Sequence, residues 1–111
     1  MLSEGERRRV VERIREQVRL GDVRLTLHAD DERVEDGLTA QELREVLGRC
    51  ELVENYLDDR RGPSCLVLGY TDRGRPVHVV CTTSLPTLIV ITVYEPRLPK
   101  WVSPTERRGT A

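Results

Sequence analysis

The sequence predicts an α+β fold in which helices cover one face of an antiparallel sheet of three to four strands. Two capping-box patterns, each followed by apolar residues at helical spacing, place helices in the first half of the chain. Three apolar runs separated by short polar turns place strands in the second half. Turns this short join only antiparallel neighbours, so the order of elements is typical of an α+β domain.

The first expected element is an extra N-terminal helix. Ser3 and Glu6 have the spacing of a capping box, so the helix should begin just after Ser3. Its apolar residues recur at helical spacing: Val10, Val11, Ile14 and Val18. Gly21 supplies the stop.

A strand and two helices are expected next. Residues 23–28 alternate apolar and polar side chains, which is the period of a half-buried strand. The acidic segment over residues 29–36 predicts a short helix. Thr39 and Glu42 form a second capping box, which opens a helix that ends near Gly48.

The remaining elements are strands. Residues 52–57 form a weak candidate. Three stronger candidates follow: residues 64–71, 77–83 and 87–94. The turn at residues 72–75 joins the first strong pair, and the turn at residues 84–86 joins the second.

At 111 residues, the chain has the length of one domain. The elements place this domain at residues 23–102, with the extra helix at residues 1–22 before it and a flexible tail at residues 103–111 after it.

Turn positions predict the register. A turn centred on Arg73 and Gly74 sets Gly69 opposite His78, and the next turn sets His78 opposite Thr92. Because side chains alternate along a strand, one face collects the more apolar set and should lie under the helices. That set is Leu66, Leu68, Tyr70, Val77, Val79, Cys81, Ile89, Ile91 and Val93. The other face carries polar residues as well and should be open: Val67, Gly69, Thr71, His78, Thr82, Thr92 and Tyr94. A slip of one residue in either hairpin would regroup these side chains.

Composition narrows the classes of function. The 18 basic and 19 acidic residues nearly balance, but they are unevenly distributed. Most charged residues between positions 22 and 59 are acidic, and most between positions 60 and 111 are basic. This asymmetry predicts one acidic and one basic face, or simply solvated faces of a highly charged surface. The longest apolar run, residues 88–91, is too short to span a membrane, so no membrane partner is expected.

The three cysteines are Cys50, Cys65 and Cys81. They are odd in number and widely spaced, so they form neither a disulfide framework nor a paired zinc-ligand motif. We therefore expect no disulfide, no metal, no cofactor and a reducing, cytoplasmic location.

Several segments resemble the bacterial and archaeal family catalogued as domain of unknown function 4258. They are His28-Ala29 with residues 37–39, residues 60–69, residues 75–80, and residues 91–96 followed by Trp101. The resemblance runs from about Leu25 to Trp101 with the segments in order. One position departs from it: many members carry Arg just before the glycine that follows the histidine helix, and this chain carries Asp36.

That family looks similar to the RelE, BrnT and MqsR toxins of type II toxin–antitoxin systems, and some members are encoded beside zinc-finger antitoxins of the MqsA type. The resemblance implies a RelE-like sheet and metal-independent cleavage of mRNA by acid–base chemistry. It also implies RNA as substrate and a zinc-finger antitoxin as partner. A homodimer is left open.

Cleavage of this kind needs a base for the 2′-hydroxyl, a cation for the phosphorane and an acid for the 5′-oxygen. His28 and His78 are candidate base and acid because unperturbed histidine titrates near neutrality. Tyr94 is a candidate acid or phosphate ligand. The residues predicted to bind substrate are Arg60, Arg61, Arg73, Arg75, Thr92 and Arg97.

Each candidate also has a structural interpretation. His28, at the end of the predicted strand, would cap backbone groups. His78 would fill a satisfied position on a packed sheet. Tyr94 would pack against Pro96 and Trp101. Charged residues such as Arg73 and Arg75 are usual beside a hairpin turn for solubility alone.

The alternative function is a non-catalytic protein-binding module, including a degenerate toxin kept for partner binding. A net charge of −1 and an aromatic content of 4% favour it, because RNA-binding proteins are usually basic and stack bases on aromatic rings. Such a module would dock its partner through an exposed strand edge or its acidic helix region. A small-molecule enzyme fits less well, because no phosphate loop, nucleotide fingerprint, nucleophile elbow or metal-ligand cluster is present.

Overall fold

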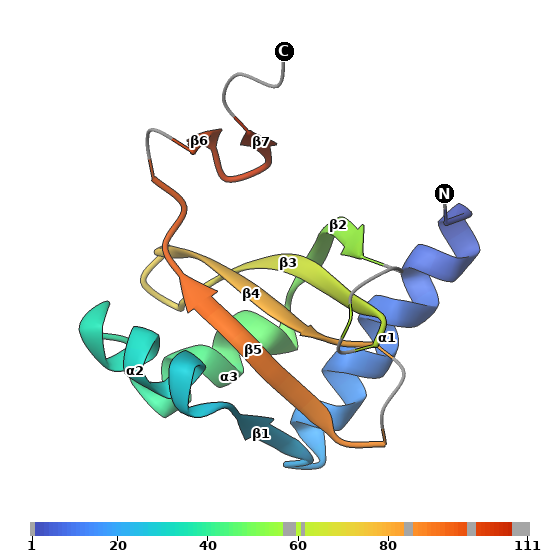
Figure 1. The fold of residues 1–111 in the computed structure, drawn as a ribbon, viewed down its shortest axis with the longest axis horizontal. Helices are drawn as coiled ribbons and strands as arrows, with labels where there is room; N and C mark the ends of the chain where they lie inside the picture. Colours follow the sequence, from blue (N-terminus) through green and yellow to red (C-terminus); the bar gives the residue numbers. More distant parts are fainter. Residues whose placement is uncertain (1, 57–59, 61, 84–85, 98–99, 108–111) are drawn as a thin grey trace.

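The computed structural model describes residues 2–56, 60, 62–83, 86–97 and 100–107. This part of the chain has an α+β fold with three helices, a five-stranded mixed sheet and a separate two-stranded hairpin (Figure 1). The helices are α1 (Glu4–Arg19), α2 (Leu27–Glu35) and α3 (Ala40–Gly48). The sheet strands are β1 (Val23–Leu25), β2 (Glu51–Tyr56), β3 (Ser64–Tyr70), β4 (Pro76–Thr82) and β5 (Leu88–Tyr94). The hairpin is formed by β6 (Trp101–Ser103) and β7 (Glu106–Arg107).

Both predicted capping boxes are confirmed. The Ser3 hydroxyl accepts the Glu6 N–H at 3.1 Å, and the Glu6 carboxylate accepts the Ser3 N–H at 3.0 Å. The same exchange between Thr39 and Glu42 opens α3, with both bonds at 3.0 Å. Gly21, with φ of 75°, follows the C-cap of α1. A left-handed residue costs glycine little, so the helix ends where the sequence predicts.

The first strand is shorter than predicted. It ends at Leu25, and Thr26 caps α2 by accepting the Ala29 N–H at 3.0 Å. His28 therefore lies in the first turn of α2 and not at the end of a strand. The predicted strand over residues 23–28 is wrong in its second half, because a threonine at an N-cap starts a helix more strongly than the alternating pattern extends a strand.

The sheet has the order β1-β5-β4-β3-β2. Its four later strands are antiparallel neighbours, as predicted, but β1 pairs in parallel with β5. The sheet is thus mixed and five-stranded rather than antiparallel with three to four strands. In Figure 1, α1 and α3 lie behind the sheet, and α2 flanks the side formed by β1 and β5.

The register between β3 and β4 differs from the predicted one by a single residue. Tyr70 pairs with Pro76, and Leu68 pairs with His78. Thr71 belongs to the turn, where its N–H donates to the Arg75 carbonyl and its hydroxyl accepts the Arg75 N–H. Because the turn contains one more residue than predicted, each side chain of β3 points to the opposite sheet face from the predicted one, relative to β4.

The register between β4 and β5 differs by two residues, since His78 lies opposite Tyr94. A shift of two leaves His78 and Tyr94 on one face, as expected. A bulge between Val80 and Cys81 then changes the register farther along.

This change of face decides which residues lie under the helices. The residues that pack with the helices include Cys65, Val67, Val77, Val79, Cys81, Leu88, Val90 and Val93. Leu66, Leu68 and Ile91 are buried, but they are not part of this core, and Ile89 is only half-buried. Of the nine residues predicted to lie under the helices, four belong to that core: Val77, Val79, Cys81 and Val93.

Helix α3 lies very close to β3 at Gly69. A Cβ built on Gly69 would overlap the Val46 carbonyl oxygen and lie 2.7 Å from Val46 Cγ1. Only glycine lets the two backbones approach so closely. This contact fixes the distance of α3 from the sheet.

Helix side chains bind backbone groups of the edge strand β2 and of the part of β5 that extends past β1. On β5, the Glu32 carboxylate accepts the Val93 N–H at 3.0 Å, and the Asp36 carboxylate accepts the Glu95 N–H at 3.0 Å. Arg7 of α1 donates to the Leu52 carbonyl of β2, and Arg15 of α1 donates to the Cys50 carbonyl just before that strand. Covered edges are poor templates for strand addition.

A short hairpin lies near the chain end. Ser103 and Glu106 pair across the β6–β7 hairpin in a region predicted as a flexible tail over residues 103–111. Residues 108–111 lie outside the described residues.

No helix in the described ranges has the length and apolar content needed to cross a bilayer.

Candidate functional site

His78 lies on the sheet face opposite the helices, under the β6–β7 hairpin. Its side chain is fully buried. The Trp101 ring packs edge-on against the imidazole, with centroids 4.3 Å apart and planes at 83°. The Tyr94 ring lies at 5.2 Å and 73° on the neighbouring strand. The imidazole is therefore enclosed by aromatic side chains from β5 and from the hairpin.

Both ring nitrogens of His78 have partners. Nε2 lies 2.6 Å from the Pro104 carbonyl oxygen, and Nδ1 lies 3.1 Å from the Tyr94 hydroxyl. A carbonyl can only accept, so Nε2 carries the proton. In the neutral ring Nδ1 then accepts a hydrogen bond from the Tyr94 hydroxyl. No ring nitrogen is left for a substrate in this arrangement.

The surroundings favour the neutral form of both groups. Burial lowers the pKa of His78, and the hydrogen bond to Pro104 opposes this only in part. Burial also raises the pKa of the Tyr94 hydroxyl. Desolvation penalises whichever form is charged, which explains the opposite directions.

Two cations border the aromatic cluster. The Arg107 guanidinium lies 4.7 Å from the centre of the Trp101 ring, and Lys100 Nζ lies 5.9 Å from the centre of the Tyr94 ring. Both are within cation–π range.

Arg107 also fastens the hairpin to β2. Its Nε and Nη2 bind the two Glu54 carboxylate oxygens at 2.5 and 2.7 Å, and the Tyr56 hydroxyl donates to the same carboxylate. Arg107 lowers the pKa of Glu54, so this ion pair stays charged at neutral pH. The hairpin is held at two points, by His78 and by Glu54.

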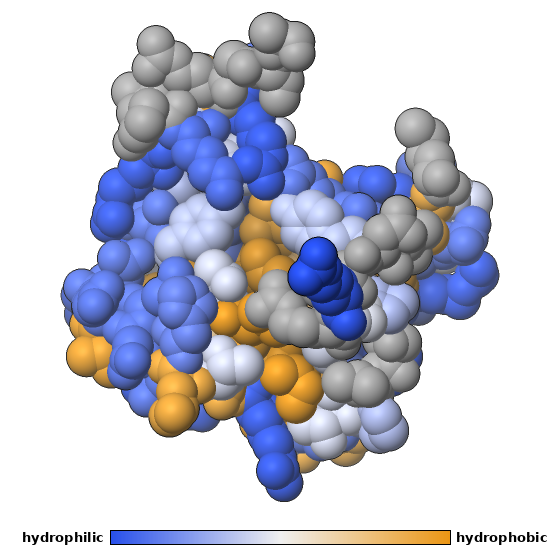
Figure 2. Space-filling model, viewed as in Figure 1, coloured by the Kyte–Doolittle hydropathy of each residue, from blue (hydrophilic) through white to orange (hydrophobic). Residues whose placement is uncertain are grey.

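The rest of this sheet face is partly open. Val80, Ile89 and Thr92 are half-buried on it. In Figure 2, which shows this side, apolar surface occupies the centre and hydrophilic side chains border it. The face is therefore of mixed polarity, as the sequence predicts, although Leu66 and Leu68 lie on it instead of Val67 and Gly69.

His28 has different neighbours. Its side chain is 68% exposed on α2, and Nε2 lies 3.2 Å from a Glu32 carboxylate oxygen. That carboxylate also accepts the Val93 N–H of β5. His28 and His78 share no bonding partner, so the structure brings together His78 and Tyr94 but not the two histidines.

Two of the predicted phosphate ligands are occupied by carboxylates. Arg75 Nε binds Glu95 at 2.7 Å, and its Nη2 donates to the Asp36 carbonyl. Arg97 lies 3.2 Å from Glu95 and 3.6 Å from the Asp36 carboxylate. Asp36, the residue that departs from the family pattern, thus takes part in binding both arginines.

The other predicted ligands are dispersed. Arg73 lies in the β3–β4 turn beside a surface hollow that Thr39, Glu42 and Glu45 also line. Arg60 is exposed, and Arg61 lies outside the described residues. Thr92 lies on the open face opposite Val80.

Sequence reasoning missed the residues that fasten the hairpin: Glu54, Tyr56, Pro104 and Arg107. Arg107 and Glu54 are 53 positions apart, and no local pattern connects them. The sequence points to Trp101 through the family resemblance and as a packing partner of Tyr94, but not as a neighbour of His78. The one feature of the sequence that could have pointed to these contacts is the basic character of the chain end.

The three cysteines are free and buried. Cys65 and Cys81 lie opposite each other on β3 and β4, with sulfurs 4.0 Å apart. Their hydrogen bond, followed by burial, raises the pKa of Cys81, and burial raises the pKa of Cys50 to about 12. The Cys50 and Cys81 thiols are therefore weak nucleophiles and poor metal ligands. Within the described ranges, no three metal-binding side chains cluster.

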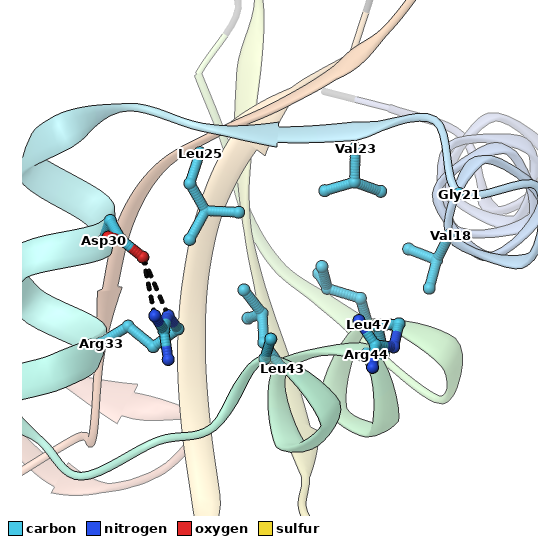
Figure 3. A pocket seen from close by; sticks show the side chains of 10 residues that line it. Val18, Gly21, Val23, Leu25, Asp30, Arg33, Leu43, Arg44 and Leu47 are labelled. Carbon is cyan, nitrogen blue, oxygen red and sulfur yellow. Dashed lines mark hydrogen bonds and ion pairs between the residues drawn. The ribbon is translucent and has the colours of Figure 1, made fainter.

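A pocket of about 230 Å³ lies on the other side of the molecule, where α1, β1, α2 and α3 meet. Figure 3 shows Val23 and Leu25 of β1 on one wall, with Leu43 and Leu47 of α3 facing them. Arg44 of α3 also lines the pocket. From α2, the pocket is lined by Asp30 and Arg33, which form an ion pair at 2.8 Å.

Comparisons with known proteins give one match. A family model described as Domain of unknown function (DUF4258) matches residues 25–95. This range includes α2, α3 and the strands β2 to β5, but neither α1 nor the β6–β7 hairpin. No curated protein matches the chain, and no solved structure does.

Proposed function

The chain belongs to the DUF4258 family, and we propose that it is a non-catalytic protein-binding module that docks a partner protein through α2. One observation carries the proposal. His78 is fully buried and uses both ring nitrogens within the fold. General acid–base catalysis needs a group within hydrogen-bond reach of the substrate, and His78 offers none.

The electrostatics also favour this function. Arg75 and Arg97 are neutralised by Glu95 and Asp36. RNA affinity depends largely on cations that are free to replace counterions around phosphates. With these two arginines paired and a net charge of −1, an RNA-binding role has little support.

Helix α2 is the best-supported docking element. Leu27 and Val34 are exposed on it at 86% and 62%. Exposed aliphatic side chains next to an apolar pocket mark interaction sites more often than bare polar surface does. Of the two docking routes that the sequence leaves open, the acidic helix is favoured, because helix side chains already bind backbone groups of β2 and of the end of β5.

The test is retention of proteins from a lysate of the source cells on tagged wild type, Leu27→Asp and Val102→Asp. Val102 is a matched control, because it is 57% exposed on β6. The proposal predicts a protein that wild type and Val102→Asp retain and Leu27→Asp loses. Equal retention by all three variants would contradict docking through α2.

A metal-independent endoribonuclease of the RelE or MqsR kind is the second candidate, and with it a type II toxin inhibited by a zinc-finger antitoxin. Tyr94 favours it, because this tyrosine is half-buried on the partly open face with Lys100 beside its ring. A tyrosine near a cation can serve as acid or phosphate ligand. RNA cleavage that Tyr94→Phe abolishes, together with growth arrest by wild type, would establish this function instead.

A further inference from the structure

The surface around the pocket consists of four strips in a fixed order, which we call the α2–α3 surface. On α2, the exposed Asp31 and Glu35 lie on one side of the exposed ridge of Leu27 and Val34. Asp30 and Arg33, which line the pocket, lie on the other side of that ridge. The pocket follows, and Arg44 of α3 comes last. Each strip is either charged, apolar and exposed, or hollow, so each can be matched by a strip of the opposite kind on a partner.

The ridge is apolar and uncovered. Leu27, Asp30 and Val34 are spaced at i, i+3 and i+7, so they lie on one side of α2. Asp30 also lines the pocket, which places the ridge next to it. Of the five large hydrophobic residues exposed in the described ranges, Leu27 and Val34 belong to this surface.

The flanking charges have no ion-pair partner among the residues that the structure describes. Arg44 donates to the Gln41 side-chain oxygen at 2.8 Å and has no carboxylate partner among residues 2–56 or the other described ranges. Asp31 and Glu35 likewise have no cationic partner in the described part of the chain. One side of the surface is therefore anionic and the other cationic.

A two-fold rotation reverses the order of the strips. The carboxylates of one copy then face Arg44 of the other, and each ridge faces a pocket. Interfaces of two-fold dimers must be self-complementary in this sense. We infer that a second copy of this chain docks on the α2–α3 surface to form a symmetric dimer, an inference that rests on the proposed docking role of α2.

Pocket size favours a side chain over a metabolite. Cavities that bind small molecules usually measure roughly 300–1,000 Å³. At about 230 Å³ this pocket is smaller, and its walls are mainly aliphatic. A metabolite would also leave the ridge uncovered, whereas a second copy covers the ridge and fills the pocket together.

The first test is the molar mass of the full chain in solution, measured by light scattering during size exclusion over a range of concentrations. The inference predicts a dimer for wild type and for Val102→Asp. Leu27→Asp should raise the dissociation constant by at least about thirtyfold, the loss expected for a central interface anchor. Leu27 is 86% exposed, so the variant should fold, which circular dichroism checks.

Charge reversal gives a sharper test. Arg44→Glu places like charges opposite each other in both halves of the dimer, and so does Asp31→Arg combined with Glu35→Arg. Each variant alone should be monomeric. An equimolar mixture should form a heterodimer, because the carboxylate introduced on α3 of one copy then faces the two arginines introduced on α2 of the other. Native mass spectrometry distinguishes this heterodimer from either homodimer.

Three results would overturn the inference: a monomeric wild type, a dimer that Leu27→Asp leaves intact, or charge variants that fail to pair when mixed. A monomeric wild type that still retains another protein through Leu27 would leave the proposed function standing. RNA cleavage by a dimeric wild type would overturn the proposed function and leave the dimer standing.

Discussion

His78 on β4 donates its Nε2–H to the Pro104 carbonyl oxygen in the β6–β7 hairpin, at 2.6 Å. This bond joins the sheet to a chain segment that follows the last sheet strand. It also occupies the one nitrogen of the neutral imidazole that can act as a donor. The contact that holds the hairpin is thus the same contact that withholds His78 from a substrate.

Replacing the two histidines should affect stability very differently. His78→Ala removes a buried ring and the bonds to Tyr94 and Pro104, so it should lower the free energy of unfolding by about 2–4 kcal/mol. His28→Ala removes a side chain that is 68% exposed, and the change should stay within about 0.5 kcal/mol. Urea denaturation of both variants measures this. Equal losses would contradict a structural role for His78.

Burial of neutral His78 predicts a pH dependence. Its pKa is lowered in the fold, whereas the unfolded chain has the ordinary value of about 6.5. The unfolded state therefore binds more protons just below that value, and stability falls as the pH decreases toward the folded pKa. Stability should be fully present above a pH of about 6.5 and lower at a pH of about 5.5.

The control for the pH dependence is His78→Gln, which keeps an N–H donor but does not titrate. Its stability should change less than that of wild type over the same range. The lowered pKa of Glu54 adds a loss only near and below the ordinary carboxyl pKa of about 4.3, outside this range. Parallel pH curves for the two proteins would show that His78 is not the titrating group.

Several elements could be predicted because their signals are local. The side chain and backbone of Ser3 and Glu6 are enough to start α1, and the same holds for Thr39 and α3. The register could not be predicted, because Thr71 joins either the strand or the turn depending on its bonds to Arg75. The parallel partner of β1 lies far along the chain in β5 and has no local signal.

Gly69 should tolerate no side chain. Gly69→Ala forces α3 away from β3, because the new Cβ would overlap the Val46 carbonyl, and it should cost about 1–3 kcal/mol. Gly48→Ala is the control: no atom lies within 4 Å of the added Cβ. That change should be neutral or stabilise by up to about 1 kcal/mol. Thermal unfolding of both variants measures the difference, and similar melting temperatures would contradict the close approach at Gly69.

Glu32 should be the carboxylate on α2 that matters for stability. Glu32→Ala leaves the Val93 N–H at the edge of β5 without its acceptor, so it should cost about 1–2 kcal/mol. Glu35→Ala, on the exposed side of the same helix, should change stability by less than about 0.5 kcal/mol. Hydrogen exchange at Val93 should accelerate in the first variant alone. Unchanged exchange there would mean that Glu32 does not protect the edge.

The candidate site could be predicted in part, because side chains alternate along each strand whatever the exact register. His78 and Tyr94 share a face in the predicted and in the observed register, because the shift between β4 and β5 is even at that point. Whether His78 is exposed could not be predicted, since the hairpin that covers it is held by the contact of Arg107 with Glu54. A polar chain end gives no pattern from which that contact follows.

The most direct test of the account is incubation of the purified wild-type chain with RNA in EDTA, followed by gel analysis of the RNA. We predict that the RNA stays intact, because neither ring nitrogen of His78 is available to a substrate and Arg75 and Arg97 are paired with carboxylates. Cleavage by wild type that is lost in Tyr94→Phe would contradict it.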